Sequence, residues 1–414
     1  MNKQITTPSM YIDAHFHIDD LIQYIADIPA LLTANSISGT ASCHSYEGFL
    51  LAMSIKIKLL QIKNNQVHSN HLKTIEDSDT QQPKPSAHLH TGTSIHVMTD
   101  TRDNMPIPGT QSGQRDGSSI QGTPAWPGIQ SSPRDSSPIQ GTPAWPGTQS
   151  GPRDSSPAPS TQARSNTQTF PCDITPAPSN LNPALNPSVT ISFGIHPQAV
   201  DIALIDLLAE LAGKGLIQAI GECGFDFYGD RPSCILNDNN LTMQKLAFTA
   251  QVEMAKKFSL PIIIHARKAQ ALIFEYRREL GELPAVIFHS WNGPANEARH
   301  LLRHIPHAYF SFGTSLLNGN KKTFTSAGTV PLANILTESD APWQPPRELP
   351  VPGAKPLRTF SSPLDVPRVL DFIALAQTAK GEFLQGFWQT NPDIGILQNI
   401  RQAVLNNYSR IYGL

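Results

Sequence analysis

The chain has 414 residues, a formal net charge of -2 at pH 7 and a charged fraction of only 15%. A balance so near neutrality excludes broad electrostatic binding to nucleic acid, so an anionic substrate would need local positive charge, for which bound metal ions are one source. No stretch reaches the roughly 18 apolar residues that span a bilayer, and the first residues lack the apolar core of a signal peptide. We therefore expect a cytoplasmic protein without membrane contact.

Eight short apolar runs lie along two flanks of the chain, and we interpret each as a buried strand of a parallel sheet. They cover residues 10–15, 37–43, 189–195, 216–221, 261–265, 285–289, 308–312 and 334–337. Helical patterns lie between several of them, at residues 199–212, 240–258, 268–280 and 295–305. This alternation favours an α/β fold of the (β/α)8 TIM barrel type over an open doubly wound sheet. The second and third strands have the weakest patterns.

Residues 70–187 differ in composition from both flanks. Of the 36 prolines in the chain, 16 lie between Pro106 and Pro187, and the segment IQGTPAWPG begins at both Ile120 and Ile139. A segment made mostly of Pro, Gly, Ser, Thr and Gln cannot bury enough apolar surface to offset its chain entropy. We therefore predict a low-complexity, disordered insertion.

This insertion divides the predicted barrel into two parts. Residues 1–69 supply the first two strands, residues 70–187 form the insertion, and residues 188–414 supply the remaining strands and a C-terminal helix. We expect the insertion in the βα connection after the second strand, where it could cover or extend the site. It is either a tolerated surface insertion or a docking tether that acts through Trp126 and Trp145.

The four cysteines of the chain are Cys43, Cys172, Cys223 and Cys234. None of their spacings is CxxC, so they indicate neither a zinc ribbon nor a dense disulfide framework. We expect reduced thiols, as is usual in the cytosol.

Side chains that can bind a metal stand at the ends of five of these apolar runs. They are His15 and His17 at the first run, then Glu222, His265, His289 and Asp340 at later ones. Because the carboxyl ends of parallel strands meet at one face of a barrel, we expect these groups to converge there. Six ligands exceed the needs of one tetrahedral ion with an open position. They suit two ions about 3.5–4 Å apart, as in phosphate-ester hydrolysis.

Each of these residues also has a structural explanation. A histidine at a strand end can be a satisfied polar residue, Glu222 can cap the next helix, and Asp340 can begin a turn before Ala341 and Pro342. Their joint occurrence at one end of successive strands favours the metal site.

Six ordered motifs resemble those of the TatD family of metal-dependent hydrolases, a branch of the amidohydrolase-like barrels. The motifs are DAHFH at 13–17, GIHP at 194–197, GECGFD at 221–226, PIIIHAR at 261–267, HSWNG at 289–293 and ESDAP at 338–342. The resemblance covers both flanks and none of the insertion. Phe225, Trp291, Asn292 and Ser339 depart from the usual family residues, but no ligand position is lost.

The resemblance implies a site with two divalent cations, which would be Mg, Mn or Zn. It assigns one ion to His15, His17 and Asp340, the second to His265 and His289, and a bridging role to Glu222. Asp340 would also orient the attacking water and take its proton. His196 and Arg267 would contact a substrate phosphate, although His196 could be a turn residue and Arg267 an ion-paired surface residue.

The resemblance further implies a deoxyribonuclease, similar to a 3′-5′ exonuclease, that acts on single-stranded DNA or on 3′ ends. A second interpretation keeps the barrel and the metal ions but hydrolyses another ester or amide, such as D-aminoacyl-tRNA or a cyclic amide. A third interpretation is a scaffold that recruits partners through the proline-rich insertion. No obligate protein partner is evident from the sequence.

Overall fold

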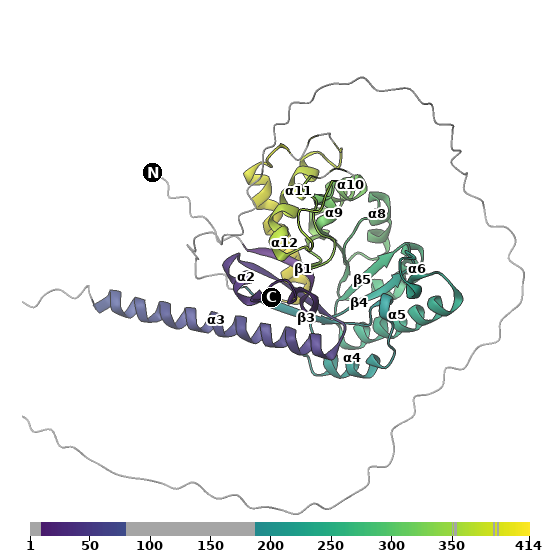
Figure 1. Ribbon diagram of the computed structural model, residues 1–414, viewed down its shortest axis with the longest axis horizontal. Helices are drawn as coiled ribbons and strands as arrows, with labels where there is room; N and C mark the ends of the chain where they lie inside the picture. Colours follow the sequence, from purple (N-terminus) through teal and green to yellow (C-terminus); the bar gives the residue numbers. More distant parts are fainter. Residues whose placement is uncertain (1–9, 80–186, 350, 352–353, 384–385, 387–388) are drawn as a thin grey trace, which may run out of the picture. The chain divides into compact units, whose positions relative to one another are not determined.

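The computed structural model describes residues 10–79 and 187–414, apart from 350, 352–353, 384–385 and 387–388, and for 66–79 it describes only the backbone. These residues fall in one compact unit (Figure 1). At its centre lies one parallel sheet in which each strand pairs with the next along the chain, from β1 to β8. The strands are β1 (Tyr11–His17), β2 (Ile37–Cys43), β3 (Val189–Phe193), β4 (Ala219–Asp226), β5 (Ile262–Arg267), β6 (Val286–Phe288), β7 (Ala308–Phe312) and β8 (Ile335–Thr337).

Hydrogen bonds between β1 and the segment after β8 close the sheet into a barrel. The backbone N–H of Asp340 donates to the carbonyl of His15 at 3.0 Å, and that of His17 donates to the carbonyl of Ala341 at 2.7 Å. The Asp13 carboxylate accepts from both the amide and the hydroxyl of Ser339, at 2.8 and 2.6 Å. The predicted TIM barrel is therefore confirmed, including its weakly patterned second and third strands.

Both faces of β1 are buried, as expected for a strand with the barrel interior on one side and helices on the other. Alternate residues point to opposite faces. His15 and His17 therefore lie on one side of the strand, from which both reach Glu222. The pairing of β1 with β2 shifts register between Asp13 and Phe16. Asp13 is buried as well, and so are the apolar residues 12, 14 and 16. The periodicity of this strand is what brings both imidazoles of the HxH pair to one side.

Helices surround the barrel (Figure 1). They are α1 (Ile18–Leu21), α2 (Ile28–Ala34), α3 (Tyr46–Asp79), α4 (Leu204–Gly213), α5 (Asp238–Phe258), α6 (Gln270–Glu275), α7 (Arg277–Gly281), α8 (Ala295–His304), α9 (Thr314–Leu317), α10 (Lys321–Thr329), α11 (Val366–Thr378) and α12 (Ile394–Tyr412). Short 3-10 turns are η1 (Pro197–Ala199), η2 (Pro232–Cys234), η3 (Leu332–Asn334) and η4 (Pro363–Asp365). No helix among the described residues is long and apolar enough to cross a membrane.

Two of the predicted helices differ from the structure. The helix predicted over 199–212 is preceded by the turn η1 and begins only at Leu204. The single helix predicted over 268–280 is divided into α6 and α7 at Tyr276. The ring of Tyr276 packs edge-on against Phe248 of α5, with centroids 4.9 Å apart, so tertiary packing overrides the local helical pattern there.

The order of elements corrects the expected place of the insertion. α3 follows β2 directly and runs to Asp79, into the range predicted as insertion. Residues 80–186 therefore join α3 to β3, which is an αβ connection and not the βα connection that we expected. Such connections attach at the amino-terminal ends of the strands, opposite the face where barrel active sites lie. The predicted disorder, the repeat and Cys172 all lie outside the described residues.

Candidate metal centre

The six predicted ligands come together at the carboxyl-terminal mouth of the barrel. They come from β1 (His15 and His17), β4 (Glu222), β5 (His265), the end of β6 (His289) and the turn after β8 (Asp340). Each exposes 8% or less of its surface. This convergence follows from the parallel barrel, in which the carboxyl ends of all eight strands meet at one face.

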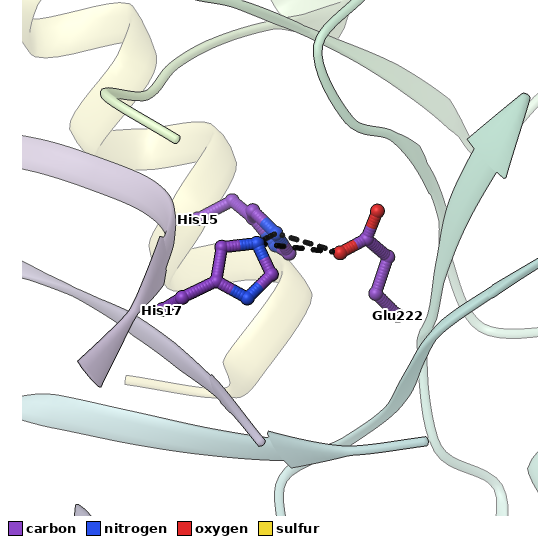
Figure 2. Close-up of side chains that lie close together, drawn as sticks. All are labelled: His15, His17 and Glu222. Atoms are coloured by element: carbon purple, nitrogen blue, oxygen red, sulfur yellow. Dashed lines mark hydrogen bonds and ion pairs between the residues drawn. The ribbon is translucent and has the colours of Figure 1, made fainter. Parts of the chain in front are cut away.

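The carboxylate of Glu222 lies at the centre of the cluster. Its Oε2 is 3.2 Å from Nε2 of His15 and 3.5 Å from Nε2 of His17 (Figure 2). Its Oε1 is 2.5 Å from Nδ1 of His265 and 2.7 Å from Nε2 of His289. The two oxygens of one carboxylate thus face two different pairs of imidazoles, as a bridging ligand must.

Glycines place the backbone that carries Glu222. Gly221 has a φ of +129°, and a Cβ added to it would lie 2.6 Å from the carbonyl oxygen of Ile263 in β5. A Cβ added to Gly194, just after β3, would lie 2.5 Å from the Cα of Gly221. Only glycine fits at these two positions, because the backbones of three neighbouring strands approach closely there. The GxH and GE motifs therefore set where the Glu222 side chain begins.

Asp340 faces the same centre from the opposite side. Its Oδ1 lies 3.4 Å from Nε2 of His17, 3.8 Å from Nε2 of His15 and 3.9 Å from Nδ1 of His289. Its Oδ2 accepts a hydrogen bond from the side-chain amide of Gln344 at 2.6 Å. Gln344 thus fixes the carboxylate so that Oδ1 points into the cluster.

Unsatisfied oxygens in the cluster indicate that cations belong there. Among the described residues, no hydrogen-bond donor serves the buried Oε2 of Glu222 or the buried Oδ1 of Asp340. Burying an ionised oxygen without a partner costs free energy. Bound cations would compensate the charge of these two oxygens. Three sets of residues in the cluster each place their ligand atoms within 4.8 Å of one another: His15, His17 and Glu222; His15, His289 and Asp340; and His196, Glu222 and His265. Imidazoles with carboxylates form a donor set that suits divalent transition metals.

The pKa values in the cluster keep Glu222 ionised among the imidazoles that surround it. Burial would raise the pKa of Glu222, but the imidazoles of His289, His196 and His15 hold it well below its ordinary value. Burial lowers the pKa of His15 to about 4, so its ring is neutral and has a lone pair to offer. Burial also opposes protonation of His289, yet the charge of Glu222 raises the pKa of that ring well above its ordinary value. A carboxylate that stays ionised among imidazoles attracts either protons or metal ions.

A second carboxylate, that of Asp226, orients one of the predicted ligands. Nε2 of His265 lies 3.0 Å from Oδ2 of Asp226. Burial would raise the pKa of Asp226, but hydrogen bonds from His265 and Gln198 lower it, so the carboxylate is ionised and can only accept. Nε2 of His265 therefore carries a proton, and in the neutral ring this leaves the lone pair on Nδ1, the atom that faces Glu222. Outer carboxylates of this kind set the tautomer of metal-binding histidines.

The two predicted substrate contacts both lie at the cluster. His196 Nε2 is 3.2 Å from Oε1 of Glu222, while its Nδ1 accepts the backbone N–H of Gln198 at 3.2 Å. An Nδ1 that accepts a hydrogen bond leaves the ring proton on Nε2 in the neutral tautomer, so Nε2 is a donor. Arg267 is held by Asp226 at 3.0 Å and by Asp230 at 2.9 Å, and its side chain remains 30% exposed.

His44 is a residue of the site that our sequence analysis missed. Its Nδ1 lies 3.0 Å from the carbonyl oxygen of Gly194, which can only accept, so Nδ1 carries the proton. Its Nε2 is buried, has no hydrogen-bond partner among the described residues and lies 3.7 Å from Oε2 of Glu222. The signal was present in the sequence, because His44 directly follows the apolar run at 37–43, at the same end of its strand as the other histidines of the site.

A parallel eight-stranded barrel with imidazoles and carboxylates gathered at its carboxyl-terminal mouth has the architecture of a metal-dependent barrel hydrolase. Residues 169–412, more than half of the chain, match the family model described as TatD related DNase. The chain therefore belongs to the TatD family, and it is a metal-dependent hydrolase of the TatD type.

Similar proteins include the 3′-5′ ssDNA/RNA exonuclease TatD of Dickeya dadantii, which is 29% identical over 201 residues, 46% of this chain and 70% of that protein. The uncharacterized metal-dependent hydrolase YabD of Bacillus subtilis is 32% identical over 160 residues, 37% of this chain and 59% of that protein. Among solved structures, the TatD homolog YJJV of Escherichia coli aligns with a TM-score of 0.41 and 21% identity, covering 55% of this chain and 78% of that one.

Proposed function

We propose that this chain is a deoxyribonuclease that removes nucleotides from the 3′ end of single-stranded DNA. The observation that carries the proposal is the buried ring of four imidazoles and two carboxylates around Glu222, since such a ligand set suits two-metal hydrolysis of phosphate esters. The relative from Dickeya dadantii, named as a 3′-5′ ssDNA/RNA exonuclease, suggests the substrate class.

The proposed cofactors are two divalent cations. The first would be held by His15, His17 and Asp340, the second by His265 and His289, and both by Glu222. When bound, such ions lower the pKa of water and offset the negative charge of a phosphate. Four imidazoles among six ligands favour Mn or Zn over Mg, which prefers oxygen ligands.

Asp340 is the proposed proton acceptor for the attacking water. Burial would raise its pKa, but the nearby imidazoles of His17, His289 and His15 lower it, so Asp340 is ionised at neutral pH. Because Gln344 holds Oδ2 at 2.6 Å, the oxygen that faces the cluster is Oδ1. A carboxylate fixed in this way orients a water molecule and accepts its proton without first turning.

His196 and Arg267 are the proposed contacts to the scissile phosphate. The Nε2–H of His196 points into the cluster and can donate to a phosphate oxygen. Arg267 uses two of its five N–H groups on Asp226 and Asp230, so others remain for a phosphate. Its guanidinium also stacks at 4.3 Å over the ring of Tyr228, which restrains its plane.

Labelled single-stranded DNA, incubated with the purified chain and Mn²⁺ or Mg²⁺, tests this function. We expect the wild type to release 3′-terminal nucleotides, and the Asp340→Asn variant to release almost none. Asp206→Asn, at an exposed position on α4, is the matched control and should behave as the wild type does. Absence of nucleotide release by the wild type at micromolar enzyme would contradict the proposal and would favour another ester or amide as substrate.

A further inference from the structure

The large apolar side chains that are exposed in the cavity above the cluster are aromatic. It has a volume of about 840 Å³, and charged or polar side chains form most of its wall. Among the large hydrophobic side chains that the described residues expose, the two that line it are Tyr228 and Trp343, which are 52% and 48% exposed. The exposed large aliphatic side chains of the described residues lie elsewhere. A ligand of this cavity thus meets flat rings beside charges.

The two rings stand at opposite sides of the mouth. Tyr228 follows β4 by two residues, and Trp343 follows Asp340 in the turn after β8. Because the strands are arranged in order from β1 to β8, β4 and β8 lie half a barrel apart. A substrate chain that crosses the cluster would therefore pass one ring on entering and the other on leaving.

The face of Tyr228 already has partners. The guanidinium of Arg267 lies 4.3 Å and the ammonium of Lys268 4.8 Å from its ring centroid. No aromatic ring or cation of the described residues stacks on Trp343. Trp343 is thus the ring of this cavity with a face open to a ligand.

The backbone of Trp343 is held in place by two hydrogen bonds. Its backbone N–H donates to the carbonyl of Asp340 at 2.8 Å, and its carbonyl accepts from the hydroxyl of Ser361. The side chain of Trp343 also acts against the rise that burial causes in the pKa of the Asp20 carboxyl. This backbone anchors the Trp343 side chain three residues after the proposed catalytic carboxylate, close to the cluster.

Cations on the cavity wall complement a nucleic acid backbone. Arg231 and Lys322 line the cavity in addition to Arg267 and Lys268. An open aromatic face in the same cavity as several cations is the combination by which proteins hold single-stranded nucleic acid, because every base has a face that can stack. Small apolar esters would instead need aliphatic walls.

We propose that Trp343 stacks on the nucleobase adjacent to the scissile phosphate, and so makes the enzyme select substrates that carry a base at this position. The inference rests on the proposed nuclease function and deepens it. Trp343 would act as a specificity-determining residue that supports binding of the strand, while the hydrolytic groups remain those of the cluster.

Paired oligodeoxynucleotides test this inference. One strand is unmodified, and the other has abasic sites at its 3′-terminal positions but the same phosphate backbone. For the wild type we expect a KM about 5- to 150-fold lower for the strand with bases, the range that corresponds to stacking of one base on an aromatic ring. Trp343→Ala should bring the ratio of the two KM values close to one, with kcat and metal content little changed. Trp343→Phe should retain most of the preference.

Tyr46→Ala is the matched control. Tyr46 is 48% exposed, as is Trp343, but it lies at the start of α3 and does not line the cavity. This variant should keep the wild-type preference. As a second readout, binding of the unmodified strand should quench tryptophan fluorescence in the non-hydrolysing Asp340→Asn variant more than in Asp340→Asn combined with Trp343→Phe.

The outcomes separate the inference from the function on which it rests. If the wild type hydrolyses DNA and Trp343→Ala keeps the full preference for bases, the stacking role is wrong and the nuclease function stands. If the wild type hydrolyses no nucleic acid, the proposed function fails, and the stacking role fails with it. If Trp343→Ala loses the preference for bases while Trp343→Phe and Tyr46→Ala keep it, the result supports both the nuclease function and the stacking role.

Discussion

Replacing Asp226 with asparagine should weaken metal binding by about 10- to 100-fold, equivalent to about 1.4–2.7 kcal/mol, although Asp226 is not itself a predicted ligand. Its Oδ2 receives hydrogen bonds from His265 Nε2 at 3.0 Å, Arg267 Nη1 at 3.0 Å and Gln198 Nε2 at 2.7 Å. Its Oδ1 receives the backbone N–H of Tyr228 at 3.0 Å. All four neighbours are donors, and an asparagine offers only one oxygen to them.

The amide nitrogen of the asparagine would therefore face donors in either orientation. If it faces His265, the ring must move its proton from Nε2 to Nδ1 in order to accept, and Nδ1 is the atom that faces Glu222. A protonated nitrogen cannot bind a metal ion. The substitution removes no proposed ligand atom. The expected loss of metal affinity therefore reports a change in the tautomer of His265, not a smaller number of ligands.

Isothermal titration of metal-free protein with Mn²⁺ or Zn²⁺ measures the effect. Asp230→Asn is the matched control, since Asp230 is 41% exposed and contacts Arg267 without contacting His265. This control should bind metal as the wild type does. Equal affinities for Asp226→Asn and the wild type would refute the reasoning, because they would mean that His265 keeps its tautomer without the carboxylate.

Three further predictions concern the backbone, the site and the insertion. Gly194→Ala should lower the free energy of unfolding, measured with urea, by about 1–3 kcal/mol, because the new Cβ would meet backbone atoms. Gly213→Ala is the control: its Cβ would lie 3.5 Å from a phenyl ring, so the free energy of unfolding should hardly change. His44→Ala should lower kcat/KM by about tenfold, the cost of one hydrogen bond, with metal content unchanged; a fall in metal content would instead make His44 a ligand. Deletion of residues 105–187 should preserve hydrolysis, and its loss would show that the insertion contributes to the site.

The barrel could be predicted from the sequence because its strands are buried on both faces and therefore consist of apolar runs. The runs at 37–43 and 308–312 coincide with β2 and β7. β4 was harder to delimit, because the predicted strand stopped at Gly221 while the real one continues through Glu222 to Asp226. Polar residues inside a strand break the apolar pattern, and here they do so because they line the mouth of the barrel.

The outer partners of the site could not be predicted from the sequence. Asp226 was visible within the GECGFD motif, but its hydrogen bonds to Gln198 and Arg267 depend on how η1 and β5 pack beside β4. The αβ position of the insertion was missed for a similar reason, since the pattern at 46–79 was not recognised as a helix. The cytoplasmic location, the substrate and the roles of the six ligands stay predictions.

The metal content of the chain, purified without chelator, tests the account most directly. If the six side chains around Glu222 form one binuclear centre, elemental analysis should find about two divalent ions per chain, and Glu222→Ala should lose metal together with activity. Fully active protein that carries no metal, or an unchanged metal content in Glu222→Ala, would contradict the account.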